Sequence, residues 1–339
     1  MPAMGSGKVT LRIVVALLLC ALIGTDARAA DPIVLSFPVR CEVGATCFVQ
    51  SYVDRDSSSG SRDYQCGSRT YDGHDGTDIR VLDLAMQRSG VEVLAAATGR
   101  VVGARDGMAD ISVRSIDKAE IAGKECGNGV VLEHDNGWRT QYCHMAKGSI
   151  RVKPGDRIAE GQPIGLVGLS GNTEFPHLHF TVRLASAIVD PFAFGAALDS
   201  CNSGGRSLWA TALQPRLDYR AREILNYGFS ATAPTMELVE SGDIRNQLSN
   251  RQGGALAAYV RAIGLQKGDE QTLTVRGPDG SLFSENKSPA LESNKAQIFI
   301  FAGRNRKAPA WPQGTYAATY RVTQNGVEVL RKTFDVKVD

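Results

Sequence analysis

Short apolar stretches follow one another closely between residues 91 and 183. Each holds four to six residues and is bounded by Gly, Pro, Asn or Asp, which is typical of β-strands rather than amphipathic helices. Asn136-Gly137 lies between two of them and accepts the positive φ angles of a type I′ turn, so it predicts a hairpin. We therefore predict an antiparallel, mostly β domain with strands over 91–96, 99–104, 111–114, 130–134, 138–143, 164–167 and 178–183.

A second series of apolar stretches occupies residues 256–263, 272–276, 296–302, 315–322 and 327–338. Pro278-Asp279-Gly280 and Asn325-Gly326 supply turns within it, and the pattern predicts a second all-β domain, a β-sandwich. This half contains no His, and no catalytic cluster is visible in it. The Gly- and Ser-rich stretch that begins at Cys201 predicts a linker, and residues 30–70 predict an irregular N-terminal segment.

The first residues have the features of an export signal. Lys8 and Arg12 precede an apolar run over 13–23, and Ala27-Arg28-Ala29 has small residues where a signal peptide is cleaved. The run is shorter than the roughly 18 to 20 residues that span a bilayer, which argues against an uncleaved anchor. We expect residues 1–29 to be a signal peptide, the mature chain to be periplasmic or extracellular, and no stable membrane anchor to remain.

Composition narrows the class of protein and of partner. Hydrophobic residues make up 43% of the 339 residues and charged residues 22%, which excludes a mostly disordered, collagen-like or multi-span membrane protein. The formal charge of +2 comes entirely from residues 1–29, the expected signal peptide. Taking Lys8, Arg12 and Arg28 from the 38 basic residues and Asp26 from the 36 acidic ones leaves 35 of each. A neutral mature chain offers no general argument for nucleic acid as a partner.

Six cysteines remain after the leader, and an even count in an exported chain favours disulfides over free thiols. Sequence leaves 15 pairings open. Cys41 with Cys47 is our first expectation, because six residues close easily through Gly44, and the predicted hairpin brings Cys126 near Cys143. No two cysteines have the two-residue spacing of a thiolate zinc site.

The chain has five His, and their placement indicates the chemistry. His74 and Asp78 are four positions apart, about 13 Å in a straight strand at roughly 3.3 Å per residue, too far to share one metal ion. A bent loop is required, for which Gly73 and Gly76 can supply unusual backbone angles. By itself this motif favours a polar loop over a metal site.

His177 and His179 are sharper candidates. Two positions apart on a strand, they share one face, with Leu178 and Phe180 on the buried face. His144 ends a neighbouring strand; we expect it to point to the face opposite Cys143 and to reach the cleft from there.

We expect His134, which lies in the hairpin turn, to be an exposed polar residue.

Two His and one Asp with an open fourth position are the ligands of a catalytic zinc site, in which a metal-bound water attacks the substrate carbonyl. No helical His-Glu-x-x-His is present, so two spare imidazoles would orient or deprotonate that water.

Three ordered motifs, His74-Asp75-Gly76-Thr77-Asp78, Gln141-Tyr142-Cys143-His144 and Pro176-His177-Leu178-His179-Phe180, resemble the signatures of the lysostaphin-like zinc endopeptidases, which cut peptidoglycan. The resemblance covers residues 70–194. It implies an antiparallel β fold, one zinc ion on His74, Asp78 and His179, and His144 and His177 as catalytic residues that do not bind the metal. The cysteines and the β domain after residue 205 depart from many members.

The sequence predicts a zinc metallopeptidase domain over 71–200, a linker over 201–215 and an accessory β-sandwich over 216–339. The resemblance implies nothing about the role of this β-sandwich. The resemblance implies an active endopeptidase acting on peptidoglycan peptides.

Two alternatives to an active endopeptidase remain open. One is a wall-binding protein or an activator of another wall hydrolase whose groove is blocked, for example by residues 31–70. The other is a carrier barrel, since the 152–165 hairpin is similar to biotinyl and lipoyl domains, although no Lys stands at a matching tip. Oligomeric state is not predicted.

Overall fold

Antiparallel strands dominate the chain, as the spacing of apolar stretches predicts. The computed structural model describes residues 1–3, 5, 32–201, 204–246 and 250–339, and those from Pro32 to Asp339 form one unit. The signal peptide expected over 1–29 lies almost entirely outside the described residues. Among the described residues, no helix is both long and apolar enough to cross a membrane.

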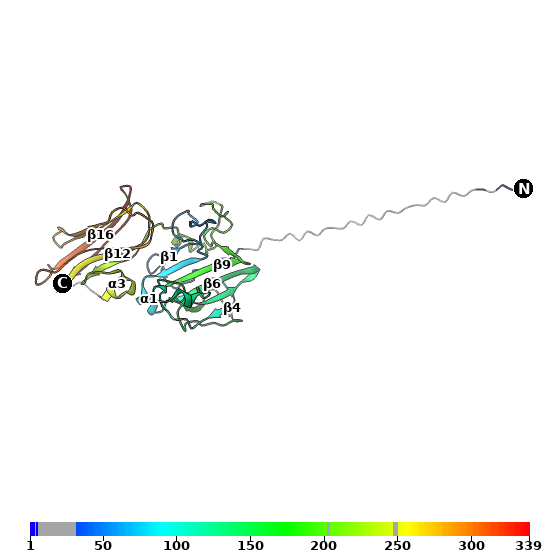
Figure 1. The fold of residues 1–339 in the computed structure, drawn as a ribbon, viewed down its shortest axis with the longest axis horizontal. Coiled ribbons are helices and arrows are strands. Elements are labelled where there is room, and N and C mark those ends of the chain that lie inside the picture. The colour runs from blue at the N-terminus through cyan, green and yellow to red at the C-terminus, as the bar shows by residue number, and fades with distance from the viewer. Residues whose placement is uncertain (4, 6–31, 202–203, 247–249) are drawn as a thin grey trace. The chain divides into compact units, whose positions relative to one another are not determined.

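One large sheet carries the candidate site (Figure 1). Its strands follow the order β1-β2-β9-β6-β5-β4-β7, and β10 pairs with β9. They are β1 (Cys47–Ser51), β2 (Thr77–Val81), β4 (Gly99–Arg105), β5 (Asn128–Glu133), β6 (Trp138–Met145), β7 (Arg157–Ile158), β9 (His177–Leu184) and β10 (Ala187–Val189). A separate pair is formed by β3 (Glu92–Leu94) and β8 (Pro163–Leu166).

The hairpin predicted at Asn136-Gly137 is confirmed. Both residues have positive φ, 58° and 78°, and β5 pairs with β6 across the turn. Side-chain alternation then sorts the sheet into two faces. Leu178 and Phe180 of β9 are fully buried in the core, and the histidines of the same strand lie on the other face.

Helices are short: α1 (Leu84–Arg88), α2 (Lys118–Ile121) and α3 (Met236–Ser241), with 3₁₀ turns η1 (Val113–Ser115), η2 (Asp135–Gly137), η3 (Gln214–Arg216) and η4 (Asp243–Asn246). The strand predicted over 111–114 is wrong, because η1 occupies its second half. The Ser112 hydroxyl accepts the N–H of Arg114 (3.4 Å), a local bond that competes with a strand ladder.

Residues 32–70, expected to be irregular, contain a strand and join the main core. β1 pairs with β2, and Leu35 and Val39 are buried with the strands of the large sheet. Leu208 and Trp209, in the stretch expected to be a linker, are buried in the same core.

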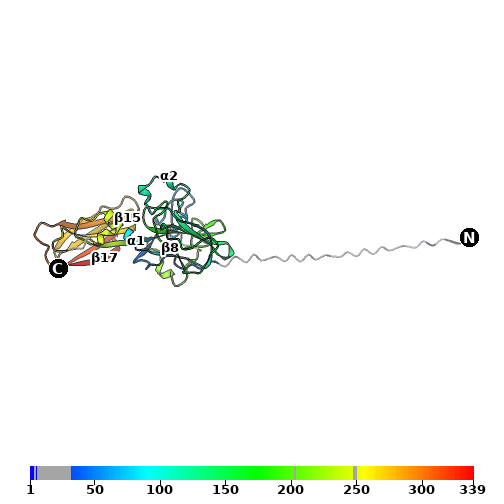
Figure 2. The ribbon, with the colours of Figure 1, turned by 90° about the horizontal axis from the view of Figure 1, so that it is seen from below.

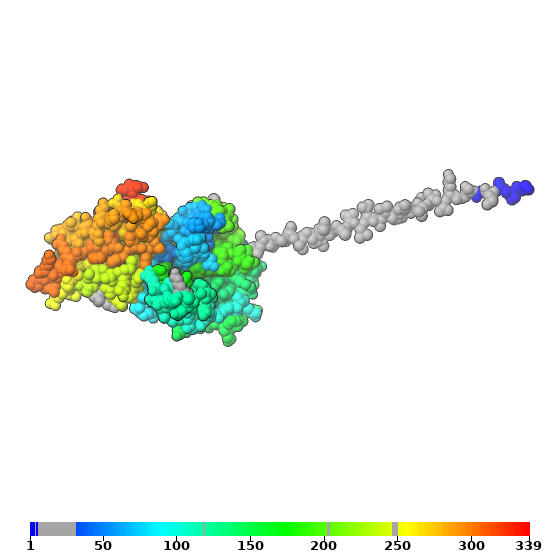
Figure 3. Space-filling view, viewed as in Figure 1, coloured from blue at the N-terminus to red at the C-terminus, as the bar shows by residue number. Residues whose placement is uncertain are grey.

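The C-terminal half forms two further sheets, as predicted (Figures 1 and 2). One has the order β11-β12-β15 and the other β14-β13-β16-β17. Ala258 and Ile300 of the first pack with Leu273 and Tyr320 of the second in a core of their own. In Figure 3 the yellow and orange residues of this half occupy a surface region apart from that of the cyan and green residues. The strands are β11 (Glu223–Ser230), β12 (Ala255–Leu265), β13 (Asp269–Arg276), β14 (Leu282–Lys287), β15 (Lys295–Asn305), β16 (Gly314–Gln324) and β17 (Val327–Val338).

All six cysteines of the described residues are paired. The expected Cys41–Cys47 disulfide is present, Cys126 is joined to Cys143, and Cys66 is joined to Cys201. The last pair is 135 residues apart in sequence, a pairing that spacing alone could not select.

Candidate metal centre

His74 lies in the bent loop that the spacing requires, just before β2. Gly73 supplies a left-handed backbone with φ of 73°, and His74 N–H donates to the Tyr71 carbonyl (3.0 Å). Gly76 does not have a positive φ angle; its lack of a side chain leaves space for the neighbouring strand β9. A Cβ at Gly76 would lie 2.6 Å from Nε2 of His179, so only glycine lets the loop approach β9 so closely.

Strand register brings the second and third donors together. Asp78 of β2 is directly opposite His179 of β9, and Cys143 of β6 is opposite His179 on its other side. Opposed residues in a sheet present their side chains to the same face. Asp78 and His179 therefore meet on the face away from the core.

Three side-chain atoms converge. Nε2 of His74 is 3.1 Å from Oδ1 of Asp78 and 3.2 Å from Nδ1 of His179, which is 2.9 Å from the same Asp78 oxygen. Tetrahedral ligands 2.0–2.1 Å from a zinc ion lie about 3.3 Å apart. Both the donor types and their separations therefore fit one zinc ion.

In His74, His144 and His177, the Nδ1 atom of the ring lies against a backbone carbonyl. Nδ1 of His74 donates to the Tyr52 carbonyl (2.6 Å), which leaves Nε2 unprotonated for a metal. Nδ1 of His144 donates to the Ser170 carbonyl (2.8 Å). Nδ1 of His177 faces the Phe175 carbonyl (2.9 Å). Since a carbonyl only accepts, these contacts set the tautomer. Nε2 of His144 is then available to take a proton, whereas Nε2 of His177 lies 3.3 Å from Oδ1 of Asp78.

The charge state of the site follows from burial and neighbours. Burial would raise the pKa of Asp78, but the charges and hydrogen bonds of the surrounding histidines hold it well below its usual value. Burial lowers the pKa of His144 far below its ordinary value, and the neighbouring His177 and His179 add to this effect. Asp78 is thus an anion and His144 a neutral imidazole near pH 7.

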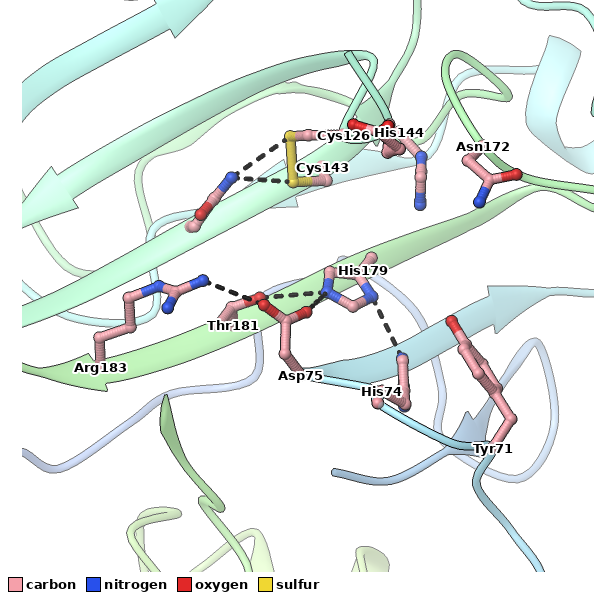
Figure 4. A pocket seen from close by; sticks show the side chains of 13 residues that line it. Tyr71, His74, Asp75, Cys126, Cys143, His144, Asn172, His179, Thr181 and Arg183 are labelled. Atoms are coloured by element: carbon pink, nitrogen blue, oxygen red, sulfur yellow. Dashed lines mark hydrogen bonds and ion pairs between the residues drawn. A yellow bond between two sulfur atoms is a disulfide. The ribbon is translucent and has the colours of Figure 1, made fainter. Parts of the chain in front are cut away.

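The donors open onto a cavity of about 330 Å³ (Figure 4). His74, His144 and His179 line it, with Tyr71 at one side and Arg183 at the other. The ring of His144 is 4.7 Å from that of His177 and 5.9 Å from that of His179, measured between centroids. No residue of 32–70 lines this cavity among the residues described.

Residues 72–191 match the model of peptidase family M23, and all three motifs lie within that range. Residues 72–191 are therefore an M23-like peptidase domain, called the M23 domain below. The family resemblance inferred from the motifs is thereby confirmed.

Relatives of the M23 domain match over short segments. Peptidoglycan DD-endopeptidase ShyB of Vibrio cholerae is 42% identical over 64 residues, 19% of this chain and 15% of that protein. ShyA of the same organism, also called a peptidoglycan DD-endopeptidase, is 46% identical over 54 residues, 16% and 12% of the two chains. Among solved structures, the catalytic domain of lysostaphin from Staphylococcus simulans is 28% identical over 35% of this chain and 77% of that one, with a TM-score of 0.26.

His144 reaches the cleft, as predicted, but the expectation that it points to the face opposite Cys143 is wrong. His144 and Cys143 line the same cavity of the M23 domain, although neighbours in a regular strand point to opposite faces (Figure 4). The cause is a φ of 60° at His144, which breaks the alternation and turns the imidazole toward His177 and His179.

His134 is buried, which corrects the expectation of an exposed polar residue. It is 9% exposed, Nδ1 donates to the Thr98 carbonyl and Nε2 accepts from the Thr140 hydroxyl, both at 2.8 Å. Because both nitrogens are used far from the donors, His134 is a structural residue of the M23 domain.

Asp75 is the site residue that sequence reasoning missed. Its Oδ1 lies 3.1 Å from Nε2 of His179, and its Oδ2 accepts from Arg183 (3.0 Å) (Figure 4). Asp75 stands beside His74 in the motif, and an acidic neighbour of a candidate ligand was the available signal.

Proposed function

We propose that the chain is an exported zinc metalloendopeptidase that hydrolyses peptide bonds in the cross-links or stem peptides of peptidoglycan. One observation carries the proposal. His74, Asp78 and His179 present three donor atoms 2.9–3.2 Å apart. Nε2 of His177 lies 3.3 Å from Asp78, and the ring of His144 lies 5.9 Å from that of His179.

His74, Asp78 and His179 would hold the metal. A bound zinc ion supplies Lewis-acid chemistry, lowering the pKa of a water and polarising a carbonyl. The two uncharged imidazoles and one carboxylate neutralise half of the ion's double charge, which leaves it electrophilic. Asp75 behind His179 and the Tyr52 carbonyl behind His74 keep both ligands oriented.

His144 and His177 would move protons. Each has Nδ1 directed at a carbonyl, so Nε2 is the basic nitrogen. One can take a proton from the attacking water and the pair can return it to the departing amine. Burial keeps His144 neutral at pH 7, in the form that accepts a proton.

The substrate class rests on the M23 match and the cavity. The two Vibrio relatives are named peptidoglycan DD-endopeptidases, and the cavity of about 330 Å³ suits the few residues around a scissile bond.

Digestion of purified peptidoglycan sacculi tests the function. The zinc-loaded protein should release soluble muropeptides, a chelator should stop the release, and added zinc should restore it. Mass spectrometry of products from defined muropeptides then identifies the bond. Zinc-loaded protein that binds sacculi but releases nothing would instead support the wall-binding or activator alternative.

A further inference from the structure

Backbone strain at the site is concentrated at His144. Its φ of 60° lies in the left-handed region, which residues other than glycine seldom adopt and which surrounding contacts must hold. Without that backbone, the alternation of β6 would direct the imidazole to the other face of the sheet.

Contacts from two segments hold residue 144. Its N–H donates to the carbonyl of Cys126 (2.8 Å), and its carbonyl accepts from the N–H of Gly168 (3.0 Å). Its ring is held separately, by Nδ1 donating to the carbonyl of Ser170 (2.8 Å).

A disulfide ties the first of these segments to β6. Cys126 is joined to Cys143, the residue directly before His144, and also accepts the His144 N–H. Cys126 is thus attached to two consecutive residues of β6, one by a covalent bond and one by a hydrogen bond. Close approach is needed, since a Cβ at Gly129 would lie 2.9 Å from Sγ of Cys126 and 2.4 Å from the Tyr142 carbonyl.

The same segment also fixes Ser170, which holds the ring. The N–H of Asn128 donates to Oγ of Ser170 (2.8 Å), and Oγ donates to the Met145 carbonyl (2.7 Å). A Cβ at Gly127 would lie 2.3 Å from the Ser170 carbonyl oxygen. Residues 126–128 therefore support both the backbone and the imidazole of His144.

We propose that the Cys126–Cys143 disulfide is a positioning device for His144: it keeps residue 126 against β6 and so holds the left-handed backbone that aims the imidazole at the metal ligands. Among the disulfides of the described residues, this is the one that lines the cavity. The metal ligands lie on β2, its preceding loop and β9, so the device acts on His144 and not on zinc. The consequence for turnover rests on the proposed function.

The prediction is a loss of turnover without loss of zinc. When the disulfide is absent, His144 can relax to negative φ and withdraw its imidazole. Misplacing a catalytic group by about 1 Å costs on the order of 10²-fold in rate, so kcat should fall by about that factor with KM and zinc affinity little changed.

The test compares two double variants of the full chain, Cys126→Ser/Cys143→Ser and, as a matched control, Cys41→Ser/Cys47→Ser. Each is assayed for zinc affinity, kcat, KM and the imidazole N–H resonance of His144, assigned by its absence in His144→Ala. The hydrogen bond to Ser170 makes this resonance observable, and a merely structural disulfide would not alter it in a folded protein.

We expect the Cys126/Cys143 variant to bind zinc, lose the resonance and lose turnover, and the control to retain all three. Persistence of the resonance at its wild-type position in the folded variant would overturn the proposal, whether or not the protein digests sacculi. Wild-type kcat in the variant, or parallel loss of zinc, would also overturn it.

If the double variant does not fold, wild-type protein can be reduced stepwise with a phosphine, and each disulfide followed by alkylation and mass mapping. Loss of the His144 resonance in step with reduction of Cys126–Cys143 supports the proposal. Loss in step with another disulfide, or with zinc release, contradicts it.

Discussion

The carboxylate of Asp75 lies 3.1 Å from Nε2 of His179, on the ring nitrogen opposite the one that meets His74 and Asp78. Arg183 holds this carboxylate from behind at 3.0 Å. The arrangement is the carboxylate–histidine pairing that orients metal ligands and raises their basicity. Asp75, which is not among the predicted metal ligands, thus orients the ligand His179.

Asp75→Asn should weaken zinc binding. The amide cannot accept the Nε2 proton as strongly, so His179 becomes a poorer ligand, and losses of about 10- to 100-fold in affinity are typical of such changes. Competition with a chromophoric chelator measures the dissociation constant. Asp72→Asn, an exposed neighbour, is the control and should bind like wild type. Equal affinities for both variants would count against this role of Asp75.

His179→Ala should abolish stoichiometric zinc binding, because it removes one of three donors. The control is His134→Ala, which removes a buried histidine far from the donors and should retain one zinc ion when folded. Metal analysis after gel filtration decides the point. A full complement of zinc in His179→Ala would remove it from the ligand set.

His144→Ala should keep zinc and lose turnover. The ring lies beside those of His177 and His179 and is not one of the three proposed ligands, and general acid–base groups contribute about 10²- to 10⁴-fold in rate. The assay is muropeptide release per zinc-loaded molecule. Digestion of sacculi at the wild-type rate would refute the assigned role.

Gly76→Ala should damage both stability and metal binding. The new methyl group would lie 2.6 Å from Nε2 of His179 and 2.9 Å from the Phe180 carbonyl, so the loop must move away from β9. Overpacking of this kind costs about 1–3 kcal/mol. Gly148→Ala is the comparison: its φ is 72° but nothing lies within 4 Å, so it strains the backbone without touching the site. Thermal unfolding and zinc affinity should separate the two, with Gly148→Ala losing stability alone.

Acid should destabilise the zinc-free protein partly through His134. Burial lowers the pKa of His134, partly offset by its hydrogen bond to Thr98, so the folded form binds a proton less readily than the unfolded chain. Its contribution to stability is present above the ordinary histidine pKa and is lost as pH falls toward the depressed value. His134→Gln should therefore show a smaller decrease of Tm between pH 7.5 and 5.5 than wild type. An identical decrease would show that another group is responsible.

Much of this site was visible in local sequence. The alternation His177-Leu178-His179-Phe180 placed two imidazoles on one face because a strand repeats every two residues, and Asn136-Gly137 located the hairpin because few other pairs accept its φ angles. The four-residue spacing of His74 and Asp78 required a bend, and the structure has one. Two strands of the sandwich, β11 and β14, were missed; β14 is polar and largely exposed, so its sequence carries no apolar stretch.

Only the tertiary structure decided those features of the site that depend on contacts between residues far apart in sequence. The carbonyls of Tyr52 and Ser170 set the tautomers of His74 and His144. Asp75 reaches His179 from the loop before β2 and is held there by Arg183 of β9, and Cys66 is joined to Cys201. His144 is the clearest case: strand periodicity sends its ring to the wrong face, and only the left-handed backbone held by Cys126 and Gly168 returns it. The alternation of side chains along a strand depends only on neighbours in sequence, so the sequence predicts it. A strained backbone such as that of His144 persists only where contacts from distant parts of the chain hold it, so only the tertiary structure decides it.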